Sequence, residues 1–229
     1  MTCKETVKVS IEEKINNIIN EIPESITLVA VSKTRSLDEM EEAYKAGIRD
    51  YGENKVQELI EKEEKFHKDV RWHLIGHLQR NKVKYIVGKV YLIHSLDSIK
   101  LLEEIEKRYS EKGKIANALI QINIGKDPNK TGILLEELED LIEACEKCNN
   151  VKIKGLMTVL PKESEEKCRK YFNDMKKIYD LLSKKSYNNI TMEYLSMGMT
   201  GDYRIAIEEG ANIIRIGEGI FGKRIYNNI

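Results

Sequence analysis

The stretch Thr27-Leu28-Val29-Ala30-Val31-Ser32-Lys33-Thr34 is the clearest indication of the fold. It begins with a short apolar run, which is typical of a buried strand. The run ends in small polar residues and a lysine, and a charged segment follows in which apolar residues recur three and four positions apart. A strand, a polar turn and an amphipathic helix in this order predict one strand–helix unit of an α/β protein.

This unit recurs to the C-terminus of the chain. We predict eight strands, at Thr27–Val31, Arg49–Tyr51, Arg71–Ile75, Val90–His94, Asn117–Asn123, Lys152–Met157, Met192–Ser196 and Ile213–Ile216. We predict helices at Ile11–Ile22, Leu37–Ala46, Lys55–Phe66, Lys82–Val87, Ser98–Tyr109, Leu135–Cys148, Glu165–Ser183 and Tyr203–Glu209. Eight such units predict an α/β fold of one (β/α)8 TIM-type barrel with an extra N-terminal helix. No linker rich in proline, glycine or serine interrupts them, so we expect residues 1–229 to form a single domain.

The composition excludes several classes of protein. Lys plus Arg and Asp plus Glu both number 38, so no net charge attracts the chain to nucleic acid or anionic lipid. No apolar run approaches the roughly 20 residues of a membrane span, and the N-terminus lacks the apolar core of a secretion signal. We therefore expect a cytoplasmic protein in which Cys3, Cys145, Cys148 and Cys168 are reduced.

Polar residues and glycines follow the predicted strands. In a parallel barrel the chemistry lies at the C-terminal ends of the strands, which together form one rim. The residues at or just past these ends are Ser32–Thr34, Gly52–Asn54, Gly76–Gln79, Ser95, Gly125, Met157–Thr158, Ser196–Thr200 and Arg215–Gly219.

Lys33 is the first candidate for chemistry at this rim. It follows a buried strand, so its amine would project into the mouth of the barrel. A lysine amine becomes a good nucleophile toward a carbonyl group when desolvation or a neighbouring cation lowers its pKa from about 10.4. A Schiff base is the natural use of such a lysine. Position alone also fits a structural lysine whose amine reaches solvent.

The last two predicted strands indicate an anion site. The segment Gly217–Gly222 contains three glycines, where exposed backbone N–H groups can hold a phosphate. Ser196, Gly198 and Thr200 follow the seventh strand, and the loops after strands 7 and 8 are the usual phosphate position in such barrels. Arg215 would point inward, either beside a ligand or into a structural ion pair.

Other patterns do not support a function. The segment Gly217–Gly222 also matches G-x-G-x-x-G, but a dinucleotide site needs an acidic residue about 20 positions later and only seven residues follow. Cys145 and Cys148 lack a second pair of ligands, and the histidines lack metal-ligand spacing, so we expect no metal site. Among the histidines, only His77 lies at the predicted rim.

Six motifs in a fixed order are more specific than any one of them. They are Ala30–Thr34 (AVSKT), Tyr51–Asn54 (YGEN), Trp72–Lys82 (WHLIGHLQRNK), Gly155–Thr158 (GLMT), Leu195–Met199 (LSMGM) and Arg215–Gly217 (RIG). With these motifs the chain resembles the pyridoxal phosphate homeostasis protein family, from about Ile11 to Phe221. The resemblance implies a barrel related to the N-terminal domain of alanine racemase, with pyridoxal 5'-phosphate (PLP) as its cofactor.

The rim positions and the resemblance together give an expected set of cofactor-binding residues. They are Lys33, Asn54, Met157, Ser196, Gly198, Thr200, Arg215, Gly217 and Glu218. The resemblance implies that Lys33 carries PLP as a Schiff base and that Asn54 lies beside the cofactor. It also implies that the phosphate is held by Ser196, Gly198, Gly217 and the backbone of Glu218.

By the same resemblance, Arg215 faces the pyridine nitrogen of PLP. An arginine there disfavours protonation of that nitrogen by like-charge repulsion, which handicaps carbanion chemistry. The chain departs from the family at Thr200, where members often have serine, and at Glu218, where they often have threonine. Thr200 keeps a hydroxyl group, whereas the Glu218 carboxylate would repel a phosphate unless its side chain points away.

The expected function is non-enzymatic: the protein carries, buffers or delivers PLP, with PLP-dependent apoenzymes as candidate recipients. A PLP-dependent amino-acid racemase using Lys33 as one base is an alternative. We expect no second domain to supply an opposing tyrosine, because only seven residues follow Gly222. A PLP-free Schiff-base aldolase acting on a sugar phosphate is a more remote alternative. We expect a monomer, with a dimer as the other option.

Overall fold

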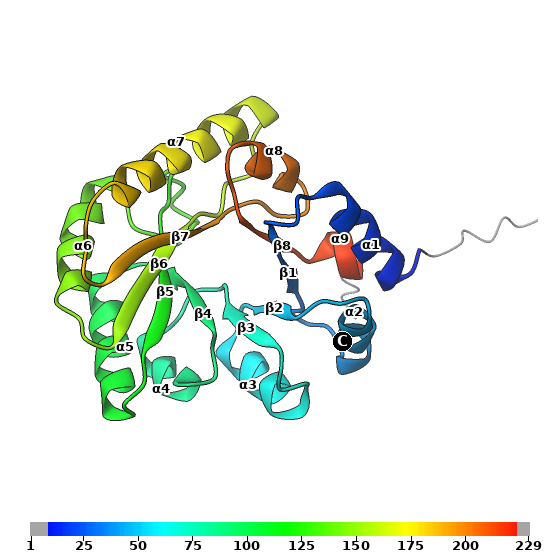
Figure 1. The fold of residues 1–229 in the computed structure, drawn as a ribbon, viewed down its shortest axis with the longest axis horizontal. Coiled ribbons are helices and arrows are strands. Elements are labelled where there is room, and N and C mark those ends of the chain that lie inside the picture. The colour runs from blue at the N-terminus through cyan, green and yellow to red at the C-terminus, as the bar shows by residue number, and fades with distance from the viewer. Residues whose placement is uncertain (1–8, 224–229) are drawn as a thin grey trace, which may run out of the picture.

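The structure, a computed structural model, describes residues 9–223 of the chain. Its eight strands form one closed barrel in chain order, and every neighbouring pair is parallel. Helices surround the barrel, as Figure 1 shows. The predicted (β/α)8 barrel with an extra N-terminal helix is therefore confirmed.

The strands are β1 (Thr27–Val31), β2 (Asp50–Glu53), β3 (Arg71–Leu74), β4 (Leu92–Leu96), β5 (Ala116–Gln121), β6 (Val151–Met157), β7 (Ile190–Ser196) and β8 (Ile213–Ile216). The α-helices are α1 (Ile11–Glu21), α2 (Leu37–Lys45), α3 (Val56–Lys65), α4 (Val83–Ile86), α5 (Ile99–Glu111), α6 (Leu138–Glu146), α7 (Glu165–Ser183), α8 (Tyr203–Glu208) and α9 (Glu218–Phe221). Two 3-10 helices, η1 (Arg80–Lys82) and η2 (Leu135–Glu137), precede α4 and α6.

Strands β2 and β4 lie further along the sequence than predicted. Gly52 and Glu53 belong to β2, because they pair with the neighbouring strand β3. The β3–β4 ladder begins only at Leu92, so β4 starts two residues later than predicted and includes Ser95. A strand begins and ends where its hydrogen bonds with the neighbouring strand begin and end. The apolar pattern of the sequence does not show these hydrogen bonds, so it does not fix the bounds.

Serine residues fix where two of the first helices begin. Ser10 precedes α1 and Ser36 precedes α2, and each accepts a hydrogen bond from the third helical residue in a capping box. Because α2 starts four residues after Lys33, the connection that carries this lysine is short.

Apolar side chains form two layers. The helices pack on the outer faces of the strands to make the main core. A smaller cluster lies in the lumen and consists of Val29, Leu92, Leu119, Met157 and Ile213. Successive side chains of a strand point to opposite faces, so each strand can contribute to both layers.

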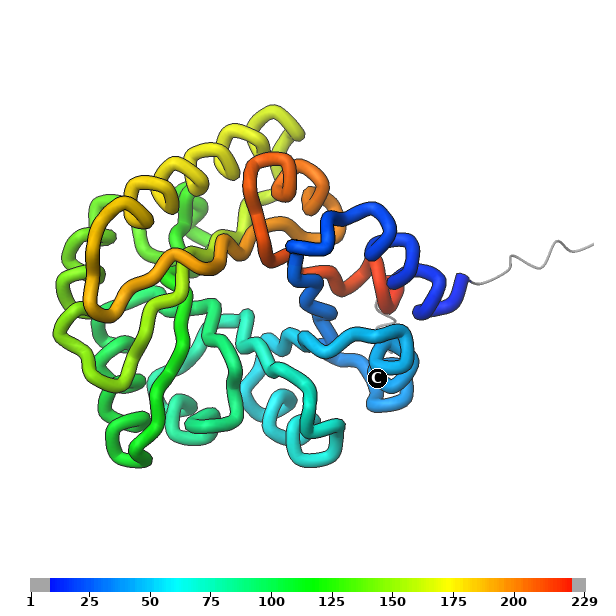
Figure 2. The backbone as a smooth tube through the Cα atoms, in the orientation of Figure 1, coloured from blue at the N-terminus to red at the C-terminus, as the bar shows by residue number. Residues whose placement is uncertain are grey.

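The segment after β8 was predicted as a glycine loop, but it forms the one-turn helix α9. The N–H groups of Ile220 and Phe221 both bond to the Gly217 carbonyl. The side chains of Ile220 and Phe221 are buried, and burying them favours this inward turn of the chain. Helix α9 contacts α1, which places the two ends of the described chain side by side (Figure 2).

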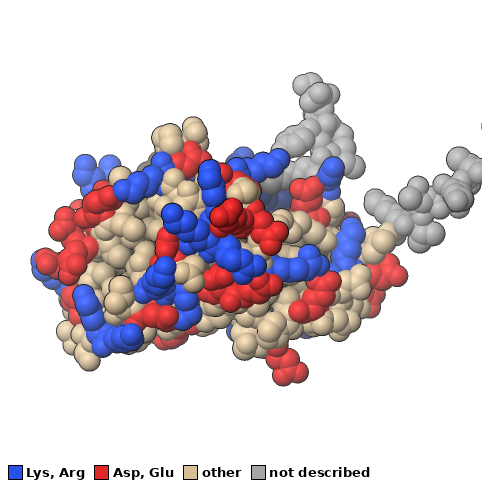
Figure 3. Space-filling view, turned by 90° about the horizontal axis from the view of Figure 1, so that it is seen from above, with Lys and Arg blue, Asp and Glu red and all other residues tan. Residues whose placement is uncertain are grey.

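The surface carries both signs of charge. Lys and Arg side chains alternate with Asp and Glu over the face seen in Figure 3. This agrees with the equal numbers of 38 for each sign in the sequence. Among residues 9–223, none of the helices has the length and apolar character required to cross a bilayer.

Gly155 allows β6 and β7 to pair closely. Its φ is +144°, and a Cβ at this position would lie 1.8 Å from the Tyr194 carbonyl oxygen. The register of the two strands shifts between Ile153 and Gly155. A side chain at position 155 would therefore meet backbone, which cannot move without breaking the ladder.

We predict that Gly155→Ala lowers the free energy of unfolding by about 3 kcal/mol or more, because it adds a steric clash to backbone strain. Gly113→Ala is the matched control: φ there is +59° and a Cβ would meet nothing within 4 Å. That substitution should cost only about 1 kcal/mol. Denaturant unfolding measures both values, and equal costs would contradict the predicted contact in the ladder.

Candidate functional site

The C-terminal ends of β1 and β8 meet at a pocket of about 310 Å³. Strand β8 pairs with β1, with Ala30 opposite Ile216, so the residues that follow these strands share one part of the rim. The pocket is lined by Val31, Lys33, Arg35, Gly217, Glu218, Gly222 and Lys223. The structure thus brings three of the predicted site residues together: Lys33, Gly217 and Glu218.

Two further basic residues line this pocket, Arg35 and Lys223. Arg35 donates one hydrogen bond to the Gly222 carbonyl, at 2.5 Å, and another to Glu39, at 3.1 Å. It therefore ties the connection after β1 to the end of α9. Sequence analysis missed both residues, although Arg35 lies only two positions after Lys33. The Arg35 charge is paired with Glu39, so the positive charge that suits an anionic ligand comes chiefly from Lys33 and Lys223.

The loops after β7 and β8 are joined by a hydrogen bond from the Gly219 N–H to Thr200 Oγ1, at 3.1 Å. Gly198 has a φ of +93°, and a Cβ there would lie 2.6 Å from the Ala206 Cβ. A glycine is thus required at position 198 for the β7 loop to approach α8. Glu218 is exposed, so solvent screens its carboxylate from an anion held by neighbouring N–H groups.

Arg215 points into the lumen, and only 3% of its surface is exposed. It donates hydrogen bonds to Ser196 Oγ, at 2.5 Å, and to the Thr158 carbonyl, at 2.8 Å. Burial lowers the pKa of Arg215 to about 10, so the guanidinium stays charged at neutral pH. Among the ion pairs formed within residues 9–223 none includes Arg215, and the Asp202 charge partly opposes the lowering of its pKa.

Ser196 was predicted to hold the phosphate, but its hydroxyl has other partners. The residue is fully buried, and its Oγ lies 3.0 Å from His94 Nδ1 and 2.5 Å from Arg215. Ser196 is still part of β7, so its side chain points into the lumen, whereas the loop begins after it. Its side chain therefore supports Arg215.

Met157 and Asn54 lie in different surroundings. Met157 is fully buried in the lumen cluster. Asn54 is half-buried directly after β2. A Cβ on Gly76 would lie 2.4 Å from the Asn54 carbonyl oxygen, so Gly76 allows the next loop to pack against Asn54 and to fix its backbone.

A buried ionic network anchors the residue on each side of Lys33. Lys62 of α3 donates to the Ser32 carbonyl, at 2.7 Å, and to Glu53 Oε1, at 2.8 Å. The Ser32 hydroxyl also donates to Glu53 Oε1, at 2.6 Å. The Thr34 N–H donates to Glu58, at 2.5 Å, and Lys62 contacts the same Glu58 oxygen at 2.7 Å.

The backbone of this connection is constrained. Thr34 has a φ of +64°, which a β-branched residue adopts only when surrounding contacts impose it. Burial raises the pKa of Glu53, and the Lys62 charge opposes that rise. Sequence analysis did not identify this network, although Glu58 and Lys62 stand four residues apart on one helix face.

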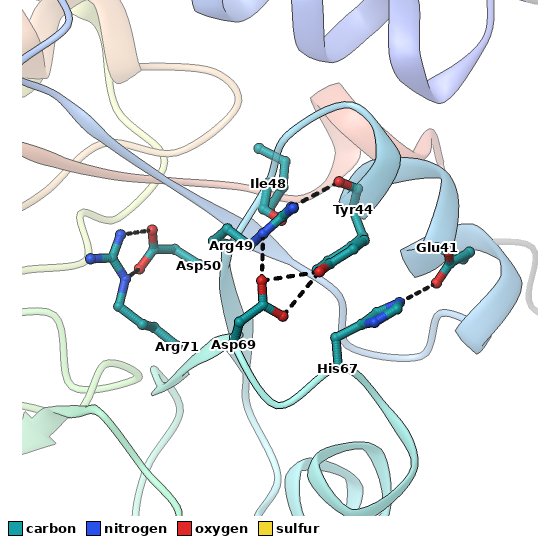
Figure 4. A network of polar contacts seen from close by, with 8 residues as sticks. All are labelled: Glu41, Tyr44, Ile48, Arg49, Asp50, His67, Asp69 and Arg71. Carbon is teal, nitrogen blue, oxygen red and sulfur yellow. Dashed lines mark hydrogen bonds and ion pairs between the residues drawn. The ribbon is translucent and has the colours of Figure 1, made fainter.

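A second polar cluster lies outside the barrel, around the start of β2 (Figure 4). The Arg49 guanidinium lies 3.7 Å from the centre of the Tyr44 ring, which in turn stacks on His67 with ring centres 3.7 Å apart. Asp69 bonds to both Tyr44 and Arg49. Because this end of β2 is opposite the rim, we interpret the cluster as structural.

Sequence comparison finds similar proteins along nearly the whole chain. The family model for the N-terminal domain of alanine racemase matches residues 9–224. The pyridoxal phosphate homeostasis protein of Aquifex aeolicus is 44% identical over 201 residues, which are 87% of each chain. That of Synechocystis is 38% identical over 213 residues, covering 92% of this chain and 97% of the relative.

Solved structures show the same fold. PipY of Synechococcus elongatus PCC7942 without PLP superimposes with a TM-score of 0.88 at 33% identity, covering 93% of this chain and 100% of PipY. PipY with PLP bound gives 0.85 at 32% identity, with the same coverage. An alanine racemase of Clostridium difficile gives 0.77 at 18% identity, covering 96% of this chain and 58% of that one, which shows a shared fold alone.

We predict that Lys62→Met lowers the free energy of unfolding by about 3–5 kcal/mol at neutral pH, because it leaves Glu53 as an uncompensated buried carboxylate. Loss of the lysine charge raises the folded-state pKa of Glu53 further above its ordinary 4.5. A raised carboxyl pKa stabilises the fold below the unfolded value, and this stability is lost as pH rises through the folded value. The variant should therefore lose stability above about pH 4.5 more steeply than the wild type.

Denaturant unfolding across the pH range measures this effect. Lys65→Met, on the exposed part of the same helix, is the matched control and should change stability by less than about 0.5 kcal/mol. Adding Glu53→Gln to Lys62→Met should flatten the pH dependence. Parallel pH curves for Lys62→Met and the wild type would show that the network does not hold a charged Glu53.

Proposed function

The chain belongs to the pyridoxal phosphate homeostasis protein family, and we propose that it binds PLP without catalysing a reaction and so carries, buffers or delivers this cofactor. One observation carries the proposal: Lys33 shares a pocket with Gly217 and Glu218. The pocket supplies an amine next to a glycine-containing turn, and PLP has both an aldehyde and a phosphate. PipY, which is 32% identical, has been solved with PLP bound, and this supports the proposal.

The residues at the rim fit the three chemical parts of PLP. When bound, PLP supplies an aldehyde that condenses with an amine and a conjugated ring that withdraws electrons. Lys33 is the proposed Schiff-base lysine, and water is released when that bond forms. We assign the phosphate to the backbone around Gly198, Gly217 and Glu218, with Thr200 joining the two loops. Lys223 adds positive charge beside this cup.

We assign the ring of PLP to the level between Asn54 and Arg215, above the apolar side chain of Met157. The Arg215 charge would oppose protonation of the pyridine nitrogen, because two positive charges repel. Such a ring draws electrons from a substrate carbanion less strongly than a protonated ring does. This property favours a binding protein over a racemase.

The proposal also covers the recipients of PLP, the oligomeric state and the cellular compartment. PLP-dependent apoenzymes are the proposed recipients, and the whole chain is the proposed PLP-binding domain, acting as a monomer. Cys145, Cys148 and Cys168 are free thiols, which supports a reducing compartment such as the cytoplasm. Cys3 lies outside the described residues.

We predict that purified protein incubated with PLP gains a visible absorption band, and that Lys33→Ala abolishes this band while the barrel stays folded. The reason is that only a Schiff base with a lysine extends the conjugation of the bound ring. Absorption spectroscopy of dialysed protein, with circular dichroism as the folding check, measures both effects. Lys100→Ala, at an exposed lysine, is the matched control and should retain the band.

The same preparations separate a binding protein from an enzyme. With a panel of L-amino acids, the wild type should exchange enantiomers no faster than free PLP does. Robust exchange that Lys33→Ala abolishes would establish a racemase instead. A wild-type protein that stays colourless and fails to retain PLP would refute the proposed function.

We predict that Arg215→Ala weakens PLP affinity by about ten- to a hundredfold, because it removes a charge-assisted hydrogen bond to the ring. The barrel should remain folded, because the strand ladder and the apolar core are unchanged. Equilibrium titration with PLP measures the affinity, and a melting curve checks the fold. Unchanged affinity in a folded variant would contradict the placement of Arg215 at the ring.

A further inference from the structure

A chain of hydrogen bonds runs through the lumen from the amino end of the barrel toward the rim. It begins at Arg71, which donates two hydrogen bonds to the Asp50 carboxylate, at 2.8 and 2.5 Å (Figure 4). Asp50 Oδ1 lies 2.9 Å from His73 Nε2. Half of the Arg71 side chain is exposed, whereas only 1% of His73 is, so the chain enters the interior at Asp50.

The chain continues through a second histidine to the arginine at the rim. His73 Nδ1 lies 2.9 Å from His94 Nε2, and His94 Nδ1 lies 3.0 Å from Ser196 Oγ. Ser196 Oγ in turn accepts from Arg215, at 2.5 Å. His94 and Ser196 have no exposed surface. Each of the two histidines therefore uses both ring nitrogens inside the barrel.

One arrangement of protons satisfies every member of this chain. Arg215 can only donate, so Ser196 Oγ accepts from it and donates its own hydrogen to His94 Nδ1. His94 then carries its proton on Nε2 and donates to His73 Nδ1. His73 likewise carries its proton on Nε2 and donates to Asp50. The opposite direction would leave the buried Ser196 hydrogen without an acceptor among residues 9–223.

The surroundings of the buried His94 favour its neutral form. Burial lowers the pKa of His94 well below 6.5, and the neighbouring His73 and Arg215 lower it further. Burial alone would raise the pKa of Asp50, but hydrogen bonds from His73 and Arg71 hold it below its ordinary 3.8. A carboxylate at one end and a guanidinium at the other thus fix the direction of the hydrogen bonds between them.

We propose that His73 and His94 are positioning residues that act through Ser196 to hold the Arg215 guanidinium in place for the cofactor ring. By taking the Ser196 hydrogen, His94 turns the lone pairs of that oxygen toward Arg215. The contacts with Ser196 and Thr158 account for two of the five N–H groups of Arg215, and others remain for a ring nitrogen. This inference rests on the proposed PLP function.

A purely structural role explains this chain of hydrogen bonds less well. The remaining lumen cluster is apolar, so the barrel can be filled without histidines. Replacing a buried polar network by apolar side chains is often neutral or stabilising. The hydrogen-bond chain also does not close on itself but ends at the Arg215 guanidinium, in the strand that leads to Gly217 at the rim. These features indicate that the histidines serve the position of Arg215.

Two substitutions at His94 separate its two ring nitrogens. An asparagine amide can replace Nδ1 and keep an acceptor for Ser196, whereas a glutamine amide reaches the position of Nε2 and loses that acceptor. We expect His94→Asn to keep PLP affinity within about twofold and to keep the visible spectrum. We expect His94→Gln to weaken PLP binding about tenfold and to shift the visible band, because Arg215 loses its fixed partner.

Two further variants complete the titration experiment. Ser196→Ala breaks the same link and should match His94→Gln, and the double variant should be no worse than either single one, because both act on one link. His67→Gln, at a histidine outside the barrel, is the matched control and should bind PLP like the wild type. Equal spectra and affinities for His94→Gln and His94→Asn would overturn the inference.

The proton arrangement is measurable without PLP. Nitrogen-15 NMR of histidine-labelled apoprotein should show His73 and His94 as neutral rings protonated on Nε2 at pH 7. A charged ring, or a proton on Nδ1, would overturn the inference even if every variant failed to fold. If the wild type failed to bind PLP, the proposed function would fall. Nε2 tautomers together with normal PLP binding by His94→Gln would instead refute the positioning role alone.

Discussion

Closure of the parallel barrel is the constraint on which the rest of the site depends. The ladder between β8 and β1 sets Val29 opposite Arg215 and Ala30 opposite Ile216. The first and last strands of the barrel therefore end at the same place on the rim. Lys33 and Gly217 lie nearly a whole chain apart in sequence, yet they line one pocket because the ring is closed.

At this part of the rim, the outer and inner faces of the strands hold different residues in position. On the outer face, Ser32 and Glu53 contact Lys62 of α3 and hold the connection that carries Lys33. On the inner face, Ser196 and Arg215 form the rim end of a polar chain. A buried ion network thus holds the connection that carries Lys33, and hydrogen bonds to Ser196 and the Thr158 carbonyl hold the Arg215 guanidinium. The scaffold thus positions the reactive groups before any ligand arrives, which lowers the cost of binding.

The sequence predicts the parts of this arrangement that follow from local order. Strands β1 and β8 and helix α7 have the predicted bounds, because clear apolar runs or capping residues mark their ends. The polar chain in the lumen was not predicted, because Asp50, His73 and His94 lie on three strands and meet only through the stagger of the barrel. The contacts of Ser196 with His94 and Arg215 were not predicted for the same reason, since the direction of its side chain depends on whether β7 has ended. The turn of α9 depends on burying Ile220 and Phe221 against the rest of the fold.

The most direct test of the central claim is to find which lysine forms the bond to PLP. Protein loaded with PLP is reduced with borohydride, digested, and mapped by mass spectrometry for the peptide that carries the pyridoxyl group. Lys223 lines the same pocket and is the natural competitor. Our account predicts that the group is found on Lys33. A label on Lys223, or label spread over surface lysines, would contradict it.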